Sequence, residues 1–213
     1  MEFQKFLDLG SKLRKINLPG EEAHYKLAPV LRLKELENID IERKKPNQAA
    51  VLAVFYPGPK EQTRFVLILR KTYKGVHSNQ VGFPGGRVEA EDRDLEHTAL
   101  RETEEEVGIP QQEVEVLRKL TRLYIPPSNF WVQPFIGVMQ RSPKLIPQES
   151  EVEAVLEIDL NDFLDDGCLT TQTLSTSYAS NIEVPAFLLN GHVVWGATAM
   201  MLSEMKEILR QAL

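Results

Sequence analysis

The sequence predicts an α/β protein in which a mixed sheet lies between helical layers, forming an α/β/α sandwich. Two apolar runs rich in β-branched and aromatic residues, at 49–57 and 64–72, flank a short linker that contains Gly58 and Pro59. Helical periodicity follows at 98–107 and again at 198–213, the end of the chain. A dinucleotide-binding Rossmann fold is excluded, because its regular βαβ alternation is missing and FPGGRVEAED lacks the G-x-G-x-x-G spacing.

The N-terminal quarter differs in composition from the remainder of the chain. Apolar residues at helical spacing predict a short amphipathic helix over residues 3–15. Residues 18–48 are rich in proline, glutamate and lysine and predict an extended lead-in. We therefore expect an N-terminal segment, 1–47, followed by the main domain, 48–213.

The main domain begins with the two apolar runs, which we expect to form a β-hairpin. Period-2 patterns, β-favouring residues and the turn Asn190-Gly191 indicate the later elements. These are strands at 114–125, 131–139 and 152–159, a short helix at 160–164, and a hairpin formed by 181–189 and 192–195.

Composition narrows the possible partners. A net charge of −6 disfavours general binding to nucleic acids or to anionic membranes. No apolar run approaches the roughly 20 residues that span a bilayer, and residues 1–20 do not resemble a signal peptide. Cys168 is the only cysteine, which excludes an intrachain disulfide and fits a reducing, cytoplasmic location. Oligomeric state is left open.

The most informative segment is acidic. Nine carboxylates lie within the eighteen residues from Glu89 to Glu106. Like charges one helical turn apart repel, so such a helix either stays fully solvated or holds cations. If residues 98–107 are helical, Glu102, Glu105 and Glu106 share one sector of about 100°, away from an apolar stripe. Gly108 suits a left-handed C-cap at the end of this helix.

Three carboxylates on one helix face, without histidine or cysteine, favour Mg²⁺ or Mn²⁺ over zinc. Arg101 lies on the flank of this face, where its guanidinium could orient a carboxylate. Gly85 and Gly86 precede the acidic segment and permit a tight loop whose backbone approaches a metal ion or a phosphate. This combination predicts a metal site.

The run RETEEEVGI at 101–109 resembles the second half of the Nudix box, G-x5-E-x7-R-E-U-x-E-E-x-G-U, where U is aliphatic. Thr103 occupies an aliphatic position. The first half is one residue longer than the consensus, so Asp92 or Glu91 takes the glutamate position. The longer spacing and the element HSNQVGFPGG at 77–86 resemble the coenzyme A pyrophosphatase branch, and the similarity covers roughly residues 48–205.

This resemblance implies a Nudix-type fold and a metal-dependent diphosphatase. Divalent cations held on carboxylates favour phosphoryl chemistry. We assign Glu102 and Glu106 as principal metal ligands and Glu105 as a ligand or as a base acting through water, the two roles of Glu105 remaining open. The expected catalytic residues are Glu102, Glu105 and Arg101.

The branch implies a coenzyme A-like small molecule as the substrate, cleaved to 4′-phosphopantetheine and adenosine 3′,5′-bisphosphate. Its phosphates need cations and hydrogen-bond donors near the FPGG loop. The expected substrate-binding residues are Arg70, Lys71, Lys74, His77, Gly85 and Gly86. The preceding stretch departs from the branch pattern at Lys71, Gly75 and Asn79. ADP-ribose, dinucleotides or nucleotide sugars are therefore alternative substrates, and a non-catalytic ligand sensor is a second alternative.

Two further groups are weaker candidates. Tyr124, Phe130 and Trp131 could stack on adenine or flank the pantetheine arm, although core packing is the more common role of such residues. Glu149, Glu151 and Glu153 follow a proline-containing loop, and one of them could supply another base or metal ligand.

Overall fold

The computed structural model describes residues 1–37, 39–72, 79–174 and 181–213. The helices are α1 (Phe3–Asp8), α2 (Gly10–Leu13), α3 (Glu21–Lys26), α4 (Val30–Glu37), α5 (Leu95–Val107), α6 (Leu160–Leu164) and α7 (Gly196–Ala212). The strands are β1 (Asn47–Pro57), β2 (Thr63–Arg70), β3 (Val81–Gly82), β4 (Gly85–Arg87), β5 (Val114–Lys119), β6 (Leu123–Ile125), β7 (Phe130–Met139), β8 (Val152–Asp159), β9 (Leu169–Leu174), β10 (Ile182–Leu189) and β11 (His192–Trp195).

The main sheet is built around β1. It has the order β3-β2-β1-β7-β5, with β4 paired to β1, β6 to β7 and β8 to β2. β1 runs parallel to β7, in a register that extends from Asn47–Phe130 to Phe55–Val138, and antiparallel to β2 and β4. The sheet is therefore mixed, as predicted. β9, β10 and β11 form a second, antiparallel sheet.

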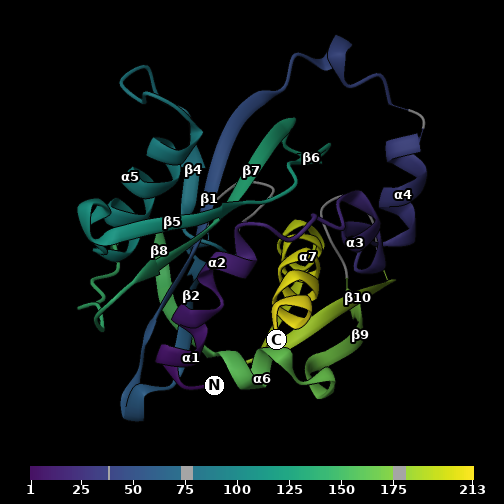
Figure 1. The fold of residues 1–213 in the computed structure, drawn as a ribbon. Helices are drawn as coiled ribbons and strands as arrows, with labels where there is room; N and C mark the ends of the chain where they lie inside the picture. Colours follow the sequence, from purple (N-terminus) through teal and green to yellow (C-terminus); the bar gives the residue numbers. More distant parts are fainter. Residues whose placement is uncertain (38, 73–78, 175–180) are drawn as a thin grey trace.

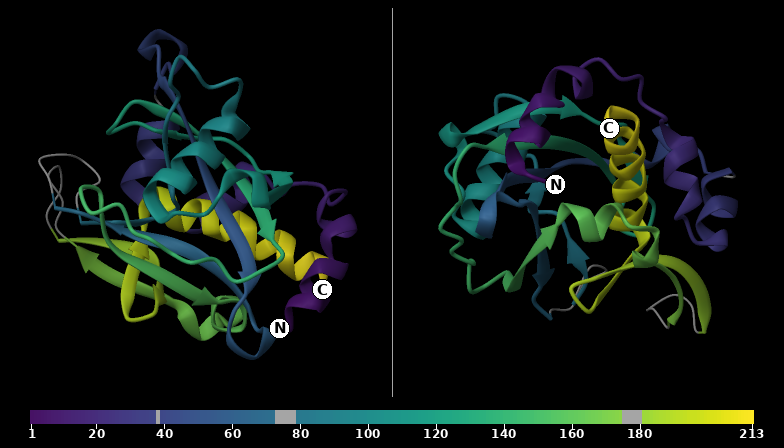
Figure 2. Two further views of the ribbon diagram at one scale, coloured as in Figure 1. Left: turned by 90° about the vertical axis from the view of Figure 1, so that its left-hand side faces the viewer. Right: turned by 60° about the horizontal axis from the view of Figure 1, so that its bottom comes forward.

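Alternating side chains of β1 enter two different cores. Val51, Ala53 and Phe55 point to one face of the sheet, and Leu52 and Val54 to the other. The first core contains the buried face of α7, and the second contains apolar residues of α5. Figures 1 and 2 show these two helices on opposite faces of the sheet. The predicted α/β/α sandwich is confirmed.

The N-terminal region differs from the prediction. Residues 18–48 were expected to be extended, whereas α3 and α4 lie within them. α3 packs against α7 through a hydrogen bond between His24 Nε2 and Glu204 at 3.2 Å and an ion pair between Lys26 and Glu207 at 2.6 Å. Helices this short are marginal alone, so tertiary packing rather than local propensity forms α3.

The remaining predicted elements are present with altered bounds. The strand expected at 114–125 is divided into β5 and β6, and both pair with β7. The acidic helix begins at Leu95 rather than at Thr98. β3, β4 and β9 are additional strands. Within the described part of the chain, no helix combines the length and apolar character required to cross a bilayer.

Candidate active site

Two glycines of β4 bring the backbone close to both β1 and α5. Gly85 has a φ of +145°, and a Cβ there would lie 2.3 Å from the Ala50 carbonyl oxygen. A Cβ on Gly86 would lie 2.4 Å from the Glu102 carboxyl carbon. Only glycine fits either position without displacement of its neighbours. The glycines therefore allow the acidic helix to place carboxylates directly against the β4 backbone.

α5 is capped at both ends and packed along one side. The Asp94 side chain accepts a hydrogen bond from the His97 N–H at 2.8 Å, and Gly108 ends the helix in the left-handed conformation. Thr103 occupies an aliphatic position of the acidic motif and is buried. Its hydroxyl donates to the Ala99 carbonyl at 2.7 Å, which satisfies the buried polar group.

Glu106 is the most deeply buried carboxylate of the acidic helix, with 2% of its side chain exposed. Its Oε2 accepts a hydrogen bond from the Gly85 N–H at 2.7 Å, while Oε1 lies 3.3 Å from Arg70 Nη1. Among the described residues, Oε1 has no hydrogen-bond partner. Burial raises the pKa of Glu106 to about 7, against the opposing effects of the Arg70 charge and the Gly85 N–H.

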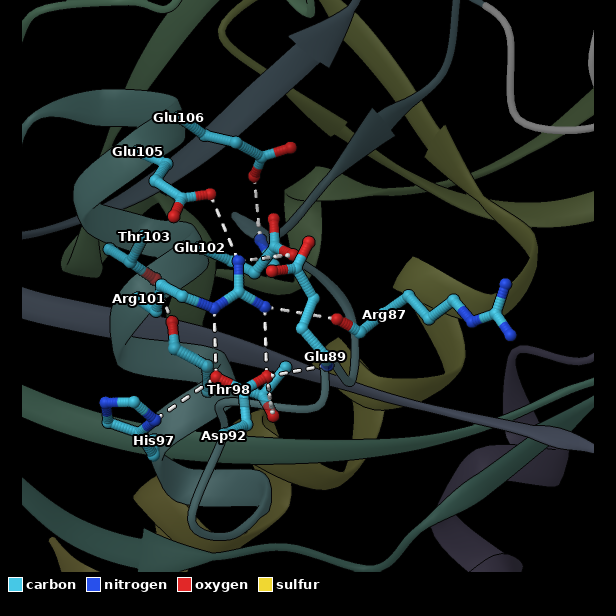
Figure 3. A network of polar contacts seen from close by, with 12 residues as sticks. Arg87, Glu89, Asp92, His97, Thr98, Arg101, Glu102, Thr103, Glu105 and Glu106 are labelled. Carbon is cyan, nitrogen blue, oxygen red and sulfur yellow. Dashed lines mark hydrogen bonds and ion pairs between the residues drawn. The ribbon is translucent and has the colours of Figure 1, made fainter.

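Arg101 is the centre of the polar network shown in Figure 3. Its Nε and Nη2 donate hydrogen bonds to the two carboxylate oxygens of Asp92, at 2.9 and 3.0 Å. The Asp92 side chain has no exposed surface. Arg101 Nη1 lies 3.1 Å from both Glu102 Oε1 and Glu105 Oε2, and Nη2 also donates to the Arg87 carbonyl at 3.2 Å.

Arg101 and Asp92 each shift the pKa of the other. Their hydrogen bonds hold the pKa of Asp92 well below its usual range and raise the pKa of Arg101. The Glu89 N–H and the Thr98 hydroxyl also donate to Asp92, each at 2.9 Å. Between the two sequence candidates for this position, Asp92 and Glu91, Asp92 is the one that Arg101 holds. The sequence left both residues open for this position, because the first half of the motif is one residue longer than the consensus.

The predicted three-carboxylate face is less convergent than the helical wheel implied. Within the described ranges, no three His, Cys, Asp or Glu side chains are close enough together to hold a metal ion. Glu105 is 55% exposed and turned to Arg101, whereas Glu106 is turned inward to Gly85. A helical wheel gives the angle of each Cα, but not the direction in which a long side chain extends.

Glu102 and Glu106 nevertheless fit a divalent cation. Both carboxylates abut the Gly85-Gly86 backbone, and the buried Glu106 Oε1 accepts no hydrogen bond from any described residue, although Arg70 Nη1 lies 3.3 Å away. Mg²⁺ typically uses only one or two carboxylates, together with substrate phosphates and water. Two carboxylates beside a glycine-rich strand are therefore an adequate protein contribution.

Of the weaker acidic candidates, Glu151 is near the site. Its charge raises the pKa of both Glu102 and Glu106, although burial is the largest cause for each. The Glu151 carbonyl accepts a hydrogen bond from the Lys71 N–H at 2.8 Å, which joins the loop before β8 to the end of β2.

A cavity of about 230 Å³ adjoins the Gly85-Gly86 strand. Arg70 lies at the boundary, because it contacts Glu106 and also lines the cavity. The Ser128 hydroxyl is another lining group, and it has no partner among the described residues. The other lining residues include Val51, Phe83, Arg87, Phe130, Val132, Thr198 and Met201.

The predicted substrate-binding residues fall into three groups. Arg70, Gly85 and Gly86 line this cavity together. Lys71 follows Arg70, and the structure gives its backbone contact with Glu151. Lys74 and His77 lie outside the described residues.

Of the three aromatic candidates, only Phe130 lines the cavity beside Gly85-Gly86. Trp131 lies under the Arg122 guanidinium at 4.2 Å, and Tyr124 donates to Asn129 at 2.9 Å. Both also line a separate cavity that includes residues of α3. Ser128 and Thr198 also line the cavity beside Gly85-Gly86. Sequence reasoning missed both, because a single hydroxyl in a loop or at a helix start has no distinguishing pattern.

The elevated pKa of Glu106 predicts a pH-dependent stability of the metal-free protein. The folded state binds this proton more tightly than the unfolded state, whose pKa is near 4.5. The resulting stability is fully present below pH 4.5 and is lost as the pH rises through about 7. Relative to Glu106→Gln, the wild type should lose about 1 to 3 kcal/mol over this window, measured by denaturant unfolding with a chelator. A difference that does not change with pH would contradict this expectation.

Residues 46–170 match the family model described as NUDIX domain. The chain is 37% identical over 129 residues to "Nudix hydrolase 15, mitochondrial" of Arabidopsis thaliana, a match that covers 60% of this chain and 45% of that protein. It is 34% identical over 172 residues to "Mitochondrial coenzyme A diphosphatase NUDT8" of Homo sapiens, covering 75% of this chain and 68% of that protein. Thus the chain spans less than half the length of the plant relative.

Solved structures show the same fold. "Crystal structure of a Nudix Hydrolase from M. Smegmatis, RenU" has a TM-score of 0.54 at 12% identity, over 78% of this chain and 87% of that one. A MutT/nudix family protein from Enterococcus faecalis has a TM-score of 0.50 at 20% identity, over 90% of this chain and 72% of that one.

Proposed function

This chain belongs to the Nudix family, and on that premise we propose that it is a metal-dependent hydrolase of the diphosphate bond in coenzyme A or acyl-CoA. Water is added across the bond, and the products are 4′-phosphopantetheine, with its acyl group if present, and adenosine 3′,5′-bisphosphate. One observation supports this function above the others. The buried Glu106, whose Oε1 has no hydrogen-bond partner among the described residues, lies beside two glycines that border a largely apolar cavity.

Glu102 and Glu106 would hold the cation, with Glu105 as an additional ligand or as the base. When bound, a divalent cation neutralises the diphosphate, polarises phosphorus and lowers the pKa of a coordinated water. Arg101 contributes by fixing Glu102 and Glu105 from one side while its fork on Asp92 keeps the guanidinium in place. Such preorganisation reduces the rearrangement needed in the transition state.

The attacking water must lose a proton to a nearby carboxylate. Glu105 is the most solvent-accessible of the three helix carboxylates, at 55% exposed, and its Oε2 already has a charge partner in Arg101. Glu151 is the other acidic group close to the site, as its effect on Glu102 and Glu106 indicates. Either carboxylate can accept the proton if the attacking water lies between that carboxylate and the phosphorus atom.

The cavity suits a substrate with one charged and one apolar part. Arg70 lines the cavity and contacts both Glu106 and the Gly85 carbonyl, so the diphosphate would sit beside Gly85-Gly86. Val51, Phe130 and Met201 contribute apolar surface to the same cavity, which fits an adenine ring or a pantetheine arm. The human relative named as a coenzyme A diphosphatase supports this substrate class.

A substrate panel tests the proposed specificity. Coenzyme A, dephospho-CoA, ADP-ribose and NADH are compared with Mg²⁺ and with Mn²⁺, and initial rates give kcat/KM for each. We expect coenzyme A to exceed ADP-ribose by at least about tenfold, a difference of roughly 1.4 kcal/mol in transition-state binding. Equal values would replace the coenzyme A assignment with a broader hydrolase of ADP-ribose, dinucleotides or nucleotide sugars. Tight binding without turnover of any compound would indicate the ligand sensor.

A further inference from the structure

Arg70 is in contact with both the carboxylate site and the cavity. Its Nη1 lies 3.3 Å from Glu106 Oε1, and its Nη2 donates to the Gly85 carbonyl at 2.8 Å. The side chain is 25% exposed and lines the cavity. It is the final residue of β2, where the pairing with β8 shifts register between Leu69 and Arg70. Irregularities of this kind re-aim side chains near functional sites.

The contact between Arg70 and Glu106 is looser than the contact between Arg101 and Asp92. Arg101 donates hydrogen bonds to both carboxylate oxygens of the buried Asp92, at 2.9 and 3.0 Å. By contrast, Arg70 approaches one oxygen of Glu106, and that oxygen has no hydrogen-bond partner among the described residues. Arg70 thus balances the charge of Glu106 without satisfying Oε1.

We propose that Arg70 is an exchangeable counter-cation: it neutralises Glu106 until a divalent cation takes Oε1, and it then turns into the adjoining cavity to bind the substrate diphosphate. This inference rests on the proposed function, since both the cation and the diphosphate come from it. Arg70 is a positioning residue toward the metal and a binding residue toward the substrate.

The exchange has a thermodynamic consequence. Two cations repel each other when they share one carboxylate oxygen, so Arg70 opposes metal binding while it remains in place. A phosphate in the cavity gives the guanidinium another partner and removes that opposition. Metal and phosphate must therefore strengthen each other's binding, and the effect is reciprocal.

The test is Mn²⁺ binding in the absence of turnover, measured by electron paramagnetic resonance of the free ion. Wild type, Arg70→Met, Arg70→Lys and Arg87→Met are titrated with and without adenosine 5′-monophosphate. Arg87 is a matched control: it lines the same cavity, but its side chain extends away from the carboxylates (Figure 3). Thermal unfolding of each variant confirms that it is folded.

We expect Arg70→Met to bind Mn²⁺ roughly 3- to 30-fold more tightly than wild type without nucleotide. Arg70→Lys, which retains the charge, should remain near wild type, as should Arg87→Met. The nucleotide should tighten Mn²⁺ binding to wild type, and Arg70→Met should lose that gain.

Weaker or unchanged Mn²⁺ binding by Arg70→Met would overturn the exchange, and so would an equal gain in Arg87→Met. Failure of the proposed function has a different result. In that case wild type and Glu106→Gln would bind Mn²⁺ equally, because Glu106 would not be a ligand.

Discussion

Replacing Glu106 with glutamine is expected to reduce turnover by at least about 10²-fold. The glutamine carbonyl can still accept the hydrogen bond that Gly85 N–H donates to Oε2 at 2.7 Å, so the local fold should survive. What is lost is the negative charge and the ligand strength of a carboxylate whose Oε1 has no hydrogen-bond partner in the part of the chain that the structure describes. The variant should therefore remain folded at the assay pH, and its defect should appear in kcat.

The measurement is steady-state kinetics on the best substrate of the panel, with saturating Mn²⁺. Glu104→Gln is the matched control, because it removes the same charge from the same helix. Glu104 accepts a hydrogen bond from Gln111 Nε2 at 2.9 Å, away from the glycine strand. We expect this control to change kcat less than about twofold. Wild-type turnover by Glu106→Gln, or an equal loss in Glu104→Gln, would show that Glu106 is not a metal ligand.

Gly85→Ala is expected to have the largest effect on stability. A Cβ there would lie 2.3 Å from the Ala50 carbonyl oxygen and 2.6 Å from the Val51 Cα, and both belong to the central strand. These are backbone atoms, so no side chain can swing away to relieve the overlap. The φ of +145° adds conformational strain for any L-residue. Together these should cost roughly 3 to 5 kcal/mol.

Denaturant unfolding measures this loss, and Gly191→Ala separates its two causes. Gly191 also has a positive φ, +78°, but a Cβ there meets no atom within 4 Å. Gly191→Ala should therefore cost only about 1 to 2 kcal/mol. If the two variants lost equal stability, the overlap with β1 would not be the cause.

Most of the fold was predictable because its elements have strong local patterns. The apolar runs of β1 and β2, the Asn190-Gly191 hairpin and the two long helices are all present. α3 was missed, since its stability comes from contacts with α7 rather than from its own residues. β9 was missed for another reason: LTTQTL is an edge strand with alternate residues exposed, and its polar composition resembles a loop.

The site was predictable to the level of the helix and the glycines, but not to the level of atomic contacts. Spacing predicted that Glu102, Glu105 and Glu106 share one face of the acidic helix. It did not show that Glu106 is buried beneath Gly85 while Glu105 faces Arg101. The cavity is also beyond sequence reasoning, because its walls come from β1, β7, the β6–β7 loop and α7.

The parallel pairing of β1 with β7 has a consequence for how the molecule folds. Asn47 pairs with Phe130, so about 80 residues must be closed into a loop before this register forms. The glycine strand and the acidic helix both lie inside that loop, and β4 needs β1 as its partner. Long-range pairing of this type slows folding, and the sheet that supports the glycine strand is complete only when this loop has closed. We therefore expect the candidate active site to form late in folding, so that substitutions in it act mainly on the unfolding rate.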